Sequence, residues 1–367
     1  MSLSFPKFPL LIQLEVLKQL ELQEVFLLSL CSEKTKRVVQ RLNMKPTNLI
    51  YLFWENGVEV FAGYDNNHNQ MKHHVADVEF VPAIPSDEMK PMKLGGNTIS
   101  YRCIETSLEE KCSHALHYLA LEDLTVLESL QRHMKDLFRF DTRVQLVLLS
   151  LHYINMSCII NDVTYTYFNV EELDTEQLEN YLTIHPGQDS LQLAAKLTGP
   201  LLKSESKLCS IKTLALHGLQ HRDGLIDLFL FFESRQNPRQ QFSEVISNFG
   251  GEYLFLTDFV YDVTDLAQLI RRWKSKEAYH NLKFVFSTPP RGISIFFEHA
   301  MEQFNFLEWD GQRRPRTVKL DPKIINLELT SSEDIDCSEW MDIQQDGGGK
   351  WASIMLSQIE IQFVVWD

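Results

Sequence analysis

Residues 8–39, FPLLIQLEVLKQLELQEVFLLSLCSEKTKRVV, constrain the fold of this chain more than any other stretch. Leu, Val and Phe recur so densely that one amphipathic helix cannot bury them all. Glu15, Glu24 and Glu33 interrupt the run every nine residues, which excludes a membrane-spanning helix. A segment this short cannot bury so much apolar surface by itself, so we expect a partner or a covering domain to complete it.

Three short helices fit this stretch. Leucines repeat at helical spacing over 10–20, and residues 22–31 are apolar nearly all round. Ser32 is a good N-cap for a third helix, and basic residues gather towards its far end, as the helix dipole favours. The second helix has no Ser, Thr or Asp cap, since Glu21 precedes it. The pattern therefore predicts three helices that end before Pro46.

Composition separates this head from the rest of the chain. Apolar residues make up 44% and aromatic residues 11% of the 367 residues, enough for a sizeable core in roughly two or three domains. The net charge of −15 makes nucleic acid a poor partner, because an acidic surface repels phosphates. Residues 1–46 carry a net +3 and the remainder −18, so we expect the two parts to have different roles.

The cysteines indicate the compartment. The six cysteines show no CxxC pair and no regular spacing, which is typical of a reduced protein. Pro6, Pro9 and Glu15 interrupt the N-terminal apolar run, so it does not have the pattern of a secretory signal. We therefore expect a cytoplasmic and/or nuclear protein that forms no disulfides.

From Asn48 onward the pattern becomes that of strands. Asn56-Gly57 lies between two β-rich arms and predicts a hairpin. Residues 64–100 contain three prolines and a Gly-Gly pair, and we expect them to form loops with weak strands. The chain ends in a second expected hairpin, whose turn contains Asp346-Gly347. The residues expected on one buried face of its last strand are Ile359, Ile361, Phe363 and Val365.

Between these hairpins, helix-like and strand-like segments alternate. LEDLTVLESLQRHMKDLF precedes RVQLVLLSL, DTEQLENYL precedes SLQLAAKL, and VTDLAQLIRRWKS precedes NLKFVFS. The last two pairs are similar to each other, although their period is irregular. The fold class predicted is therefore α+β or α/β: three N-terminal helices, then a mixed α/β domain with irregular β-α units similar to leucine-rich repeats, and a C-terminal β-hairpin.

The opening stretch resembles an F-box, the helical module that docks onto the Skp-type adaptor of cullin–RING ubiquitin ligases. The resemblance lies in Phe8-Pro9, the leucines through EVLKQL, Glu24 and the run LLSLCSEKTKRVV, and it is nearest to the nematode-type F-box proteins. DVTDLAQLIRRWKSKEAYHNLKFVFS and DIQQDGGGKWASI resemble the F-box associated type 2 region of those proteins.

This resemblance implies an F-box over 1–46 and a substrate-recruiting region over 47–367, with a subdivision near 140. The adaptor-binding residues that it implies are Phe8, Pro9, Leu10, Leu11, Leu14, Val16, Leu17, Leu20, Glu24, Leu27, Leu30, Cys31 and Lys34. The adaptor would cover the apolar face as a helix-in-groove contact. The alternative is that these helices pack on the body of the chain itself.

Residue clusters with catalytic or metal-binding chemistry are weak in this sequence. Cys112, His114 and His117 are close together, with the two histidines placed to share a helix face, but no further ligand pair has the usual spacing. His217 and His221 near Asp223 lack the HExxH glutamate, and DGGGKWAS favours a hairpin turn over a phosphate loop. The acidic stretch 331–342 is expected to be a solvated loop. We expect no cofactor and no metal.

Three functions stay open at this point. The first is a non-catalytic substrate receptor that brings an unidentified protein target to a ubiquitin ligase, without nucleic acid or membrane as a partner. The second is an interaction module of the same fold without ligase output. The third is an α/β enzyme with a helical head, for which the sequence offers no convergent nucleophile and base.

Overall fold

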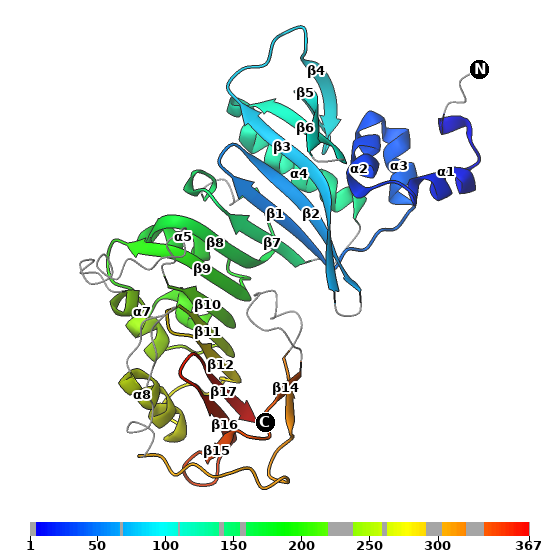
Figure 1. Cartoon of the computed structure of the whole chain (residues 1–367). Helices are drawn as coiled ribbons and strands as arrows, with labels where there is room; N and C mark the ends of the chain where they lie inside the picture. Colours follow the sequence, from blue (N-terminus) through cyan, green and yellow to red (C-terminus); the bar gives the residue numbers. More distant parts are fainter. Residues whose placement is uncertain are drawn as a thin grey trace. The chain divides into compact units, whose positions relative to one another are not determined.

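The computed structural model describes residues 5–66, 69–108, 111–138, 143–154, 159–218, 238–258, 263–290, 303–320 and 334–366. The chain forms two compact units, Met1–Tyr167 and Phe168–Asp367, and their border lies inside strand β8 (Val163–Asp174). The sequence suggested a subdivision near 140, and this border lies further along the chain. The elements of both units are labelled in Figure 1.

The first unit begins with the three predicted helices. After a short turn of 3₁₀ helix, η1 (Phe5–Lys7), come α1 (Leu10–Leu17), α2 (Leu22–Cys31) and α3 (Glu33–Gln40). The strands that follow in this unit form a sheet, in which they are hydrogen-bonded in the order β7-β1-β2-β3-β6-β5-β4. Its strands are β1 (Asn48–Trp54), β2 (Gly57–Asn66), β3 (Asn69–Val81), β4 (Lys90–Leu94), β5 (Asn97–Leu108), β6 (Lys111–Leu119) and β7 (Arg143–Leu148).

The predicted hairpin joins β1 to β2. Trp54 is paired with Gly57, so Glu55 and Asn56 form the two-residue turn. Residues 64–100 were expected to form loops with weak strands, but strands dominate there: the end of β2, all of β3 and β4 and the start of β5. The prolines and glycines that suggested loops fall mainly in the short connections or, like Pro91, on the edge strand β4, where a missing N–H is tolerated.

Helix α4 (Asp123–Leu137) lies in a segment that the sequence predicted to be helical, and it packs on one face of this sheet. It approaches the β4–β5 turn closely: Asn97 Nδ2 donates to Ser129 Oγ (2.7 Å), and Arg132 Nη1 donates to the Gly95 carbonyl (3.1 Å). The strand side chains on this face are apolar and buried. In Figure 1, α4 lies behind strands β1, β2 and β3, and no helix of this unit lies in front of them.

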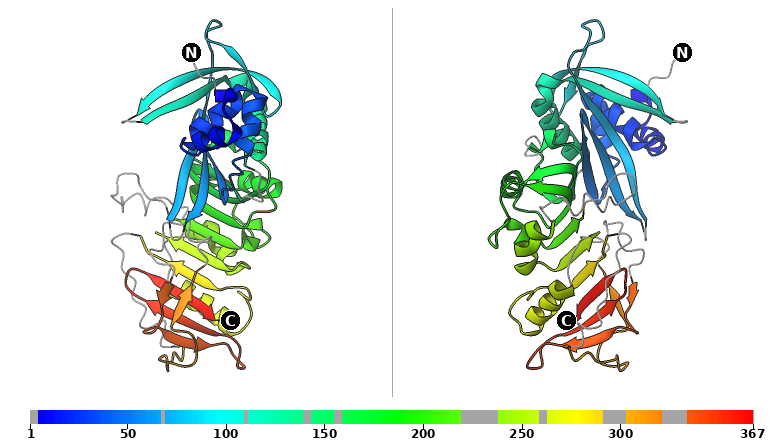
Figure 2. Two further views of the ribbon diagram at one scale, coloured as in Figure 1. Left: turned by 90° about the vertical axis from the view of Figure 1, so that its right-hand side faces the viewer. Right: turned by 60° about the vertical axis from the view of Figure 1, so that its left-hand side comes forward.

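The second unit is built on a sheet in the order β9-β10-β11-β12-β17-β16-β15. β9 to β12 are parallel, and helices connect them as in other α/β layers. Figure 1 and the right view of Figure 2 show α5, α7 and α8 on the same side of these strands. The elements are α5 (Thr175–Ile184), β9 (Ser190–Thr198), β10 (Thr213–His217), α7 (Pro238–Ser247), β11 (Tyr253–Thr257), α8 (Val263–Lys274) and β12 (Phe284–Ser287).

Both helix–strand pairs singled out in this region are confirmed as α5–β9 and α8–β12. Asp174 caps α5 by accepting hydrogen bonds from the backbone N–H groups of Glu176 (2.9 Å) and Gln177 (3.2 Å). The likeness of these units to leucine-rich repeats stays a prediction.

The chain ends in the expected hairpin and one further strand, β15 (Met341–Gln344), β16 (Trp351–Leu356) and β17 (Ile361–Trp366). Asp346 and the left-handed Gly347 (φ +72°) lie in the turn. Ile361, Phe363 and Val365 are buried as predicted, but Ile359 is 69% exposed because it precedes the strand. Two shorter strands, β13 (Thr317–Lys319) and β14 (Asp334–Asp336), pair with each other, so the acidic stretch is not wholly a loop.

Candidate functional site

Helix α1 presents an apolar face that its own unit does not bury. The helix begins after Pro9, and the side chain of Gln13 donates a hydrogen bond to the Phe8 carbonyl (2.7 Å) across its first turn. Leu17 is 1% exposed and points into the helical module, whereas Leu11 is 76% exposed. The exposed apolar residues of α1 are Leu10, Leu11, Ile12 and Val16. Large apolar side chains gathered on one exposed helix indicate a protein-interaction surface.

Helix α2 packs against β3 and β4 of the same unit. The rings of Phe26 and His133 meet edge to face, with their centroids 5.8 Å apart. Ser29 Oγ donates to the Phe26 carbonyl and lies 2.7 Å from His133 Nε2, so His133 is the donor in that second hydrogen bond. Gln23 Nε2 donates to the main-chain carbonyl of His114 (3.1 Å) on β6. These contacts fix α2 to the sheet and to α4.

The N-termini of α2 and α3 are capped by side chains. Ser32 Oγ accepts a hydrogen bond from the Thr35 N–H (3.1 Å), which confirms the predicted cap of α3. As expected, no Ser, Thr or Asp caps α2; instead Glu21 and Glu24 form a capping box, in which the Glu21 N–H donates to Glu24 Oε2 (2.9 Å). A glutamate at the N-cap can fill this role because its partner three residues on is also a glutamate.

Helix α3 is attached to the far end of α4. Lys36 Nζ forms an ion pair with Asp136 Oδ2 (2.6 Å), and Gln40 Nε2 donates to the Asp136 carbonyl (3.0 Å). His133, one turn earlier on α4, is 2% exposed. Burial lowers the pKa of His133 to about 4; the charge of Lys36 adds to this effect and that of Asp136 opposes it. The imidazole is therefore neutral at pH 7.

The predicted adaptor-binding residues fall into three groups in the structure. Leu17 lies inside the module, so its role is in the fold of the helices. The exposed residues of the prediction are Pro9, Leu10, Leu11, Val16, Glu24, Cys31 and Lys34. The half-buried residues are Phe8, Leu14, Leu20, Leu27 and Leu30. Ile12 is absent from the prediction, although its position one helical turn before Val16 was a usable signal. Whether these residues bind an adaptor stays a prediction.

The module therefore has two distinct surfaces. One, through Gln23, Phe26 and Ser29, packs on the sheet and α4 of the first unit. The other, the apolar face of α1, is exposed. Packing on the rest of the first unit, one of the two alternatives for the N-terminal sequence, therefore applies to α2, and docking of α1 on a partner stays a prediction.

The histidine clusters of the sequence do not form sites among the described residues. His114 and His117 lie on strand β6 and not on a helix, so their side chains alternate between opposite faces. The Cys112 side chain lies outside the described part of the chain, as do His221 and Asp223. No group of three or more His, Cys, Asp or Glu side chains with metal-binding geometry occurs in the part that the structure describes.

The cysteines Cys31, Cys103, Cys209 and Cys337 are free thiols, and Cys158 falls outside the described residues. A search of the described helices for one long and apolar enough to cross a membrane finds none.

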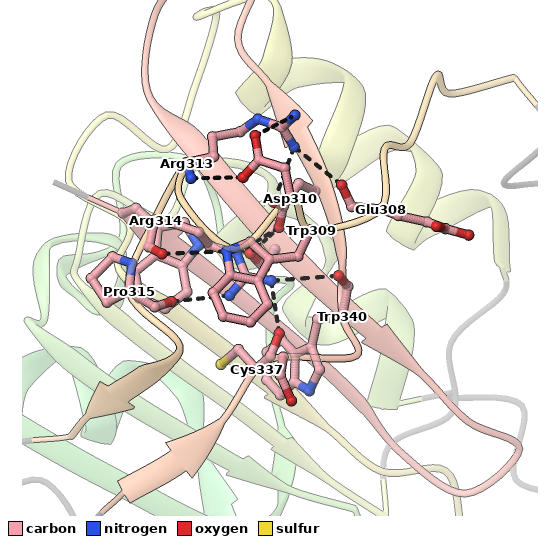
Figure 3. Close-up of polar contacts among 12 residues, drawn as sticks. Glu308, Trp309, Asp310, Arg313, Arg314, Pro315, Cys337 and Trp340 are labelled. Atoms are coloured by element: carbon pink, nitrogen blue, oxygen red, sulfur yellow. Dashed lines mark hydrogen bonds and ion pairs between the residues drawn. The ribbon is translucent and has the colours of Figure 1, made fainter.

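A dense polar cluster holds the C-terminal sheet together (Figure 3). Arg314 is buried and its Nε donates to Asp342 Oδ1 (2.7 Å), while Nη2 donates to the Cys337 carbonyl (2.7 Å). Trp309 and Trp366 lie within about 5 Å of its guanidinium carbon. Asp342 also accepts from Ser353 Oγ (2.6 Å). These hydrogen bonds attach residues 309–315 to β15 and β16, so the cluster stabilises the fold.

Comparison with known families identifies the helical module. Residues 5–47 match the family model of the F-box domain, and this range covers all three helices. The chain thus carries an F-box domain, and the match supports an F-box protein. The match does not reach the region over 47–367, whose assignment as F-box associated type 2 stays a prediction. No curated protein and no solved structure matches the chain.

An F-box domain indicates a class of protein. Such domains in general bind Skp-type adaptors and act as ubiquitin-ligase adaptors, typically without catalysis of their own. The exposed apolar face of α1 is the part of this module on which a partner can bury surface.

Proposed function

We propose that this protein is the substrate-recognition subunit of a Skp–cullin–F-box ubiquitin ligase. Its N-terminal module would bind the Skp-type adaptor, and residues 47–367 would bind a target protein. The proposal is carried by the F-box match over residues 5–47 together with the apolar face of α1 that the chain leaves exposed.

The chemistry required of such a subunit is proximity. Holding a target beside a ubiquitin-charged enzyme raises the local concentration of its lysines, so the chain needs no catalytic group of its own. The packing of α2 on the sheet supports this role, because the module and the first unit then form one body with a defined orientation. A reduced compartment, cytoplasm or nucleus, suits the free cysteines.

The test is binding of the purified adaptor to single variants of α1. Leu11→Asp and Val16→Asp place a charge on exposed apolar positions, so the fold is retained while an apolar contact is lost. We expect adaptor affinity to fall by about a hundredfold, or roughly 2.7 kcal/mol, in titration calorimetry. Asn43→Asp, exposed and outside the helices, is the control of equal charge and should bind normally.

Leu17→Asp is unsuitable for this test, because the buried position would unfold the module and abolish binding for an unrelated reason. Adaptor binding at wild-type affinity by both α1 variants would show that the F-box assignment of function is wrong. No adaptor binding by the wild-type chain would favour the second candidate, an interaction module of the same fold without ligase output.

A further inference from the structure

Basic side chains neutralise the acidic residues around β13 to β15, but they do not neutralise those on β2 and β3. Around β13 to β15 of the second unit, the upstream basic residues pair with acidic residues. Arg314 pairs with Asp342 (2.7 Å), Arg316 with Asp336 (2.7 Å) and Lys319 with Asp334 (3.6 Å). The described acidic residues of this stretch are thus largely neutralised within the chain, and they offer little field to a partner.

In the first unit, three carboxylates lie together on β2 and β3. Glu59 is directly opposite Asp77 in the register, and Glu79 is two residues along β3 on the same face. Among the residues that the structure describes, neither Glu59 nor Asp77 forms an ion pair. Val58 and Val60 alternate with Glu59 and are fully buried, so the carboxylates lie on the opposite face from this apolar core. Figure 1 shows α4 on one side of these strands and no helix of the unit on the other.

The nearest basic groups do not balance these carboxylates. His117 Nε2 lies 3.0 Å from Glu79 Oε2, and its Nδ1 lies 3.0 Å from Arg102 Nη2. A guanidinium only donates, so Nδ1 is the acceptor and the imidazole is neutral with its proton on Nε2. Burial lowers the pKa of His117, which is consistent with this state. Arg102 pairs with Glu88 (2.8 Å).

The unbalanced charge acts on Asp77. Burial first, and then the charges of Glu59 and Glu79, raise the pKa of Asp77 to about 7. Its Oδ1 is shielded from water and has no hydrogen-bond partner among the described residues. Like charges opposite each other destabilise a sheet, and the apolar core of the unit lies on the other face. The arrangement therefore costs stability, as is common where residues serve binding.

An aromatic side chain borders the carboxylates. Trp54 is paired with Gly57, which is in turn paired with Glu79, so the indole belongs to the same cross-strand row. A Cβ at Gly57 would lie 3.0 Å from the Trp54 ring, which shows that the indole covers this glycine. Its Nε1 has no partner among the described residues. Leu52 and Phe61, both half-buried, continue this face.

We propose that this open face, defined by Leu52, Trp54, Glu59, Asp77 and Glu79, binds a lysine- or arginine-bearing segment of a partner protein. Carboxylates facing an ammonium or guanidinium group supply the missing counter-charge, and the Trp54 ring supplies a cation–π contact. The apolar stems of Lys and Arg fit beside Leu52. If the proposed ligase function holds, this partner is the target; the binding itself does not depend on that function.

The test is the affinity of the full-length chain for a fluorescent octalysine peptide, without adaptor. The triple variant Glu59→Gln/Asp77→Asn/Glu79→Gln should bind the peptide about tenfold more weakly than wild type. Wild-type affinity should fall steeply with salt, which screens charges over about 8 Å at physiological strength. The matched control is Glu171→Gln/Glu176→Gln/Asp189→Asn, which removes the same charge from exposed positions of the second unit.

The triple variant should fold at least as stably as wild type, because the repulsion at Asp77 is removed, and a raised thermal midpoint is the expected result. If the triple variant does not fold, the peptide affinity of the single Asp77→Asn variant is compared with that of wild type instead. Equal loss of affinity in the control variant, or no loss in the triple variant, would overturn the proposal. Because the adaptor is absent from this assay, either result leaves the F-box function to its own test.

Discussion

The hydrogen bond between Ser29 on α2 and His133 on α4 should make the packing of the F-box on α4 dependent on pH. His133 is buried, neutral and bonded through Nε2 to Ser29 Oγ (2.7 Å). Its folded pKa is about 4, against an ordinary value of 6.5 in the unfolded chain. Between these values the unfolded chain binds more protons than the folded one. The stability that His133 contributes is therefore complete above pH 6.5 and decreases as pH falls towards 4.

The size of this effect follows from the two pKa values. Between pH 7 and pH 5, protonation of the unfolded imidazole should remove about 2 kcal/mol from the free energy of unfolding of the first unit. The other histidines and the carboxylates also titrate in this range. A variant that lacks only the His133 imidazole therefore has to serve as the reference, because it retains all of those other groups.

The assay is urea unfolding at pH 7 and pH 5, followed by amide hydrogen exchange in α2 and α4. We expect His133→Leu to be less stable than wild type at pH 7, because Ser29 loses a partner, but to lose about 2 kcal/mol less on acidification. His280→Leu, at an exposed position, is the matched control for the loss of an imidazole. Identical pH slopes for wild type and His133→Leu would refute the reasoning.

Three further outcomes are expected from the structure. Arg314→Met leaves Asp342 charged and buried, so urea unfolding should show a loss of about 3–5 kcal/mol, and Arg314→Met/Asp342→Leu should lose clearly less. Gly95→Ala should cost about 2 kcal/mol or more in the same assay, because Gly95 has φ +55° and an added Cβ would lie 2.1 Å from the Ser129 carbonyl oxygen. Gly311→Ala, with φ +80° and open space around it, should cost only about 1 kcal/mol. The thermal midpoint should not respond to reductant or EDTA, and a drop of several degrees with the chelator would contradict this expectation.

The sequence predicted the helices well because each carries its own local signal. The leucine spacing indicated α1, and the Ser32 cap marked the start of α3. The capping box of α2 was missed because glutamate is an uncommon N-cap, and only the pair of Glu21 and Glu24 makes it effective. The start of a helix is decided by the residues next to it, so residues 21–24 were sufficient to predict this capping box.

The strands β3 and β5 were expected only as weak strands among loops, for a different reason. One face of the sheet in the first unit is open, so polar and charged side chains such as Asp77 and Glu79 alternate with apolar ones along β3. That alternation lowers the apolar content that usually marks a strand, and the nearby prolines added a stronger signal for loops. Residues whose polarity weakened the strand signal, Asp77 and Glu79, are thus the ones that lie on the open face.

The distribution of the apolar surface of residues 8–39 could not be read from the sequence, because it depends on residues far along the chain. Ser29 meets His133, 104 residues away, and Gln23 meets the backbone of His114, 91 residues away. A buried Ser or Gln side chain needs a hydrogen-bond partner, so these two residues indicate which side of α2 packs on the rest of the unit. The α2 face that contains them therefore packs on the sheet and α4 of the first unit, while Leu11 on α1 has no such constraint and stays exposed. The helical module thus has one contact inside the first unit, through Gln23 and Ser29, and under the proposed function the exposed side chains of α1 would form a second contact with the adaptor.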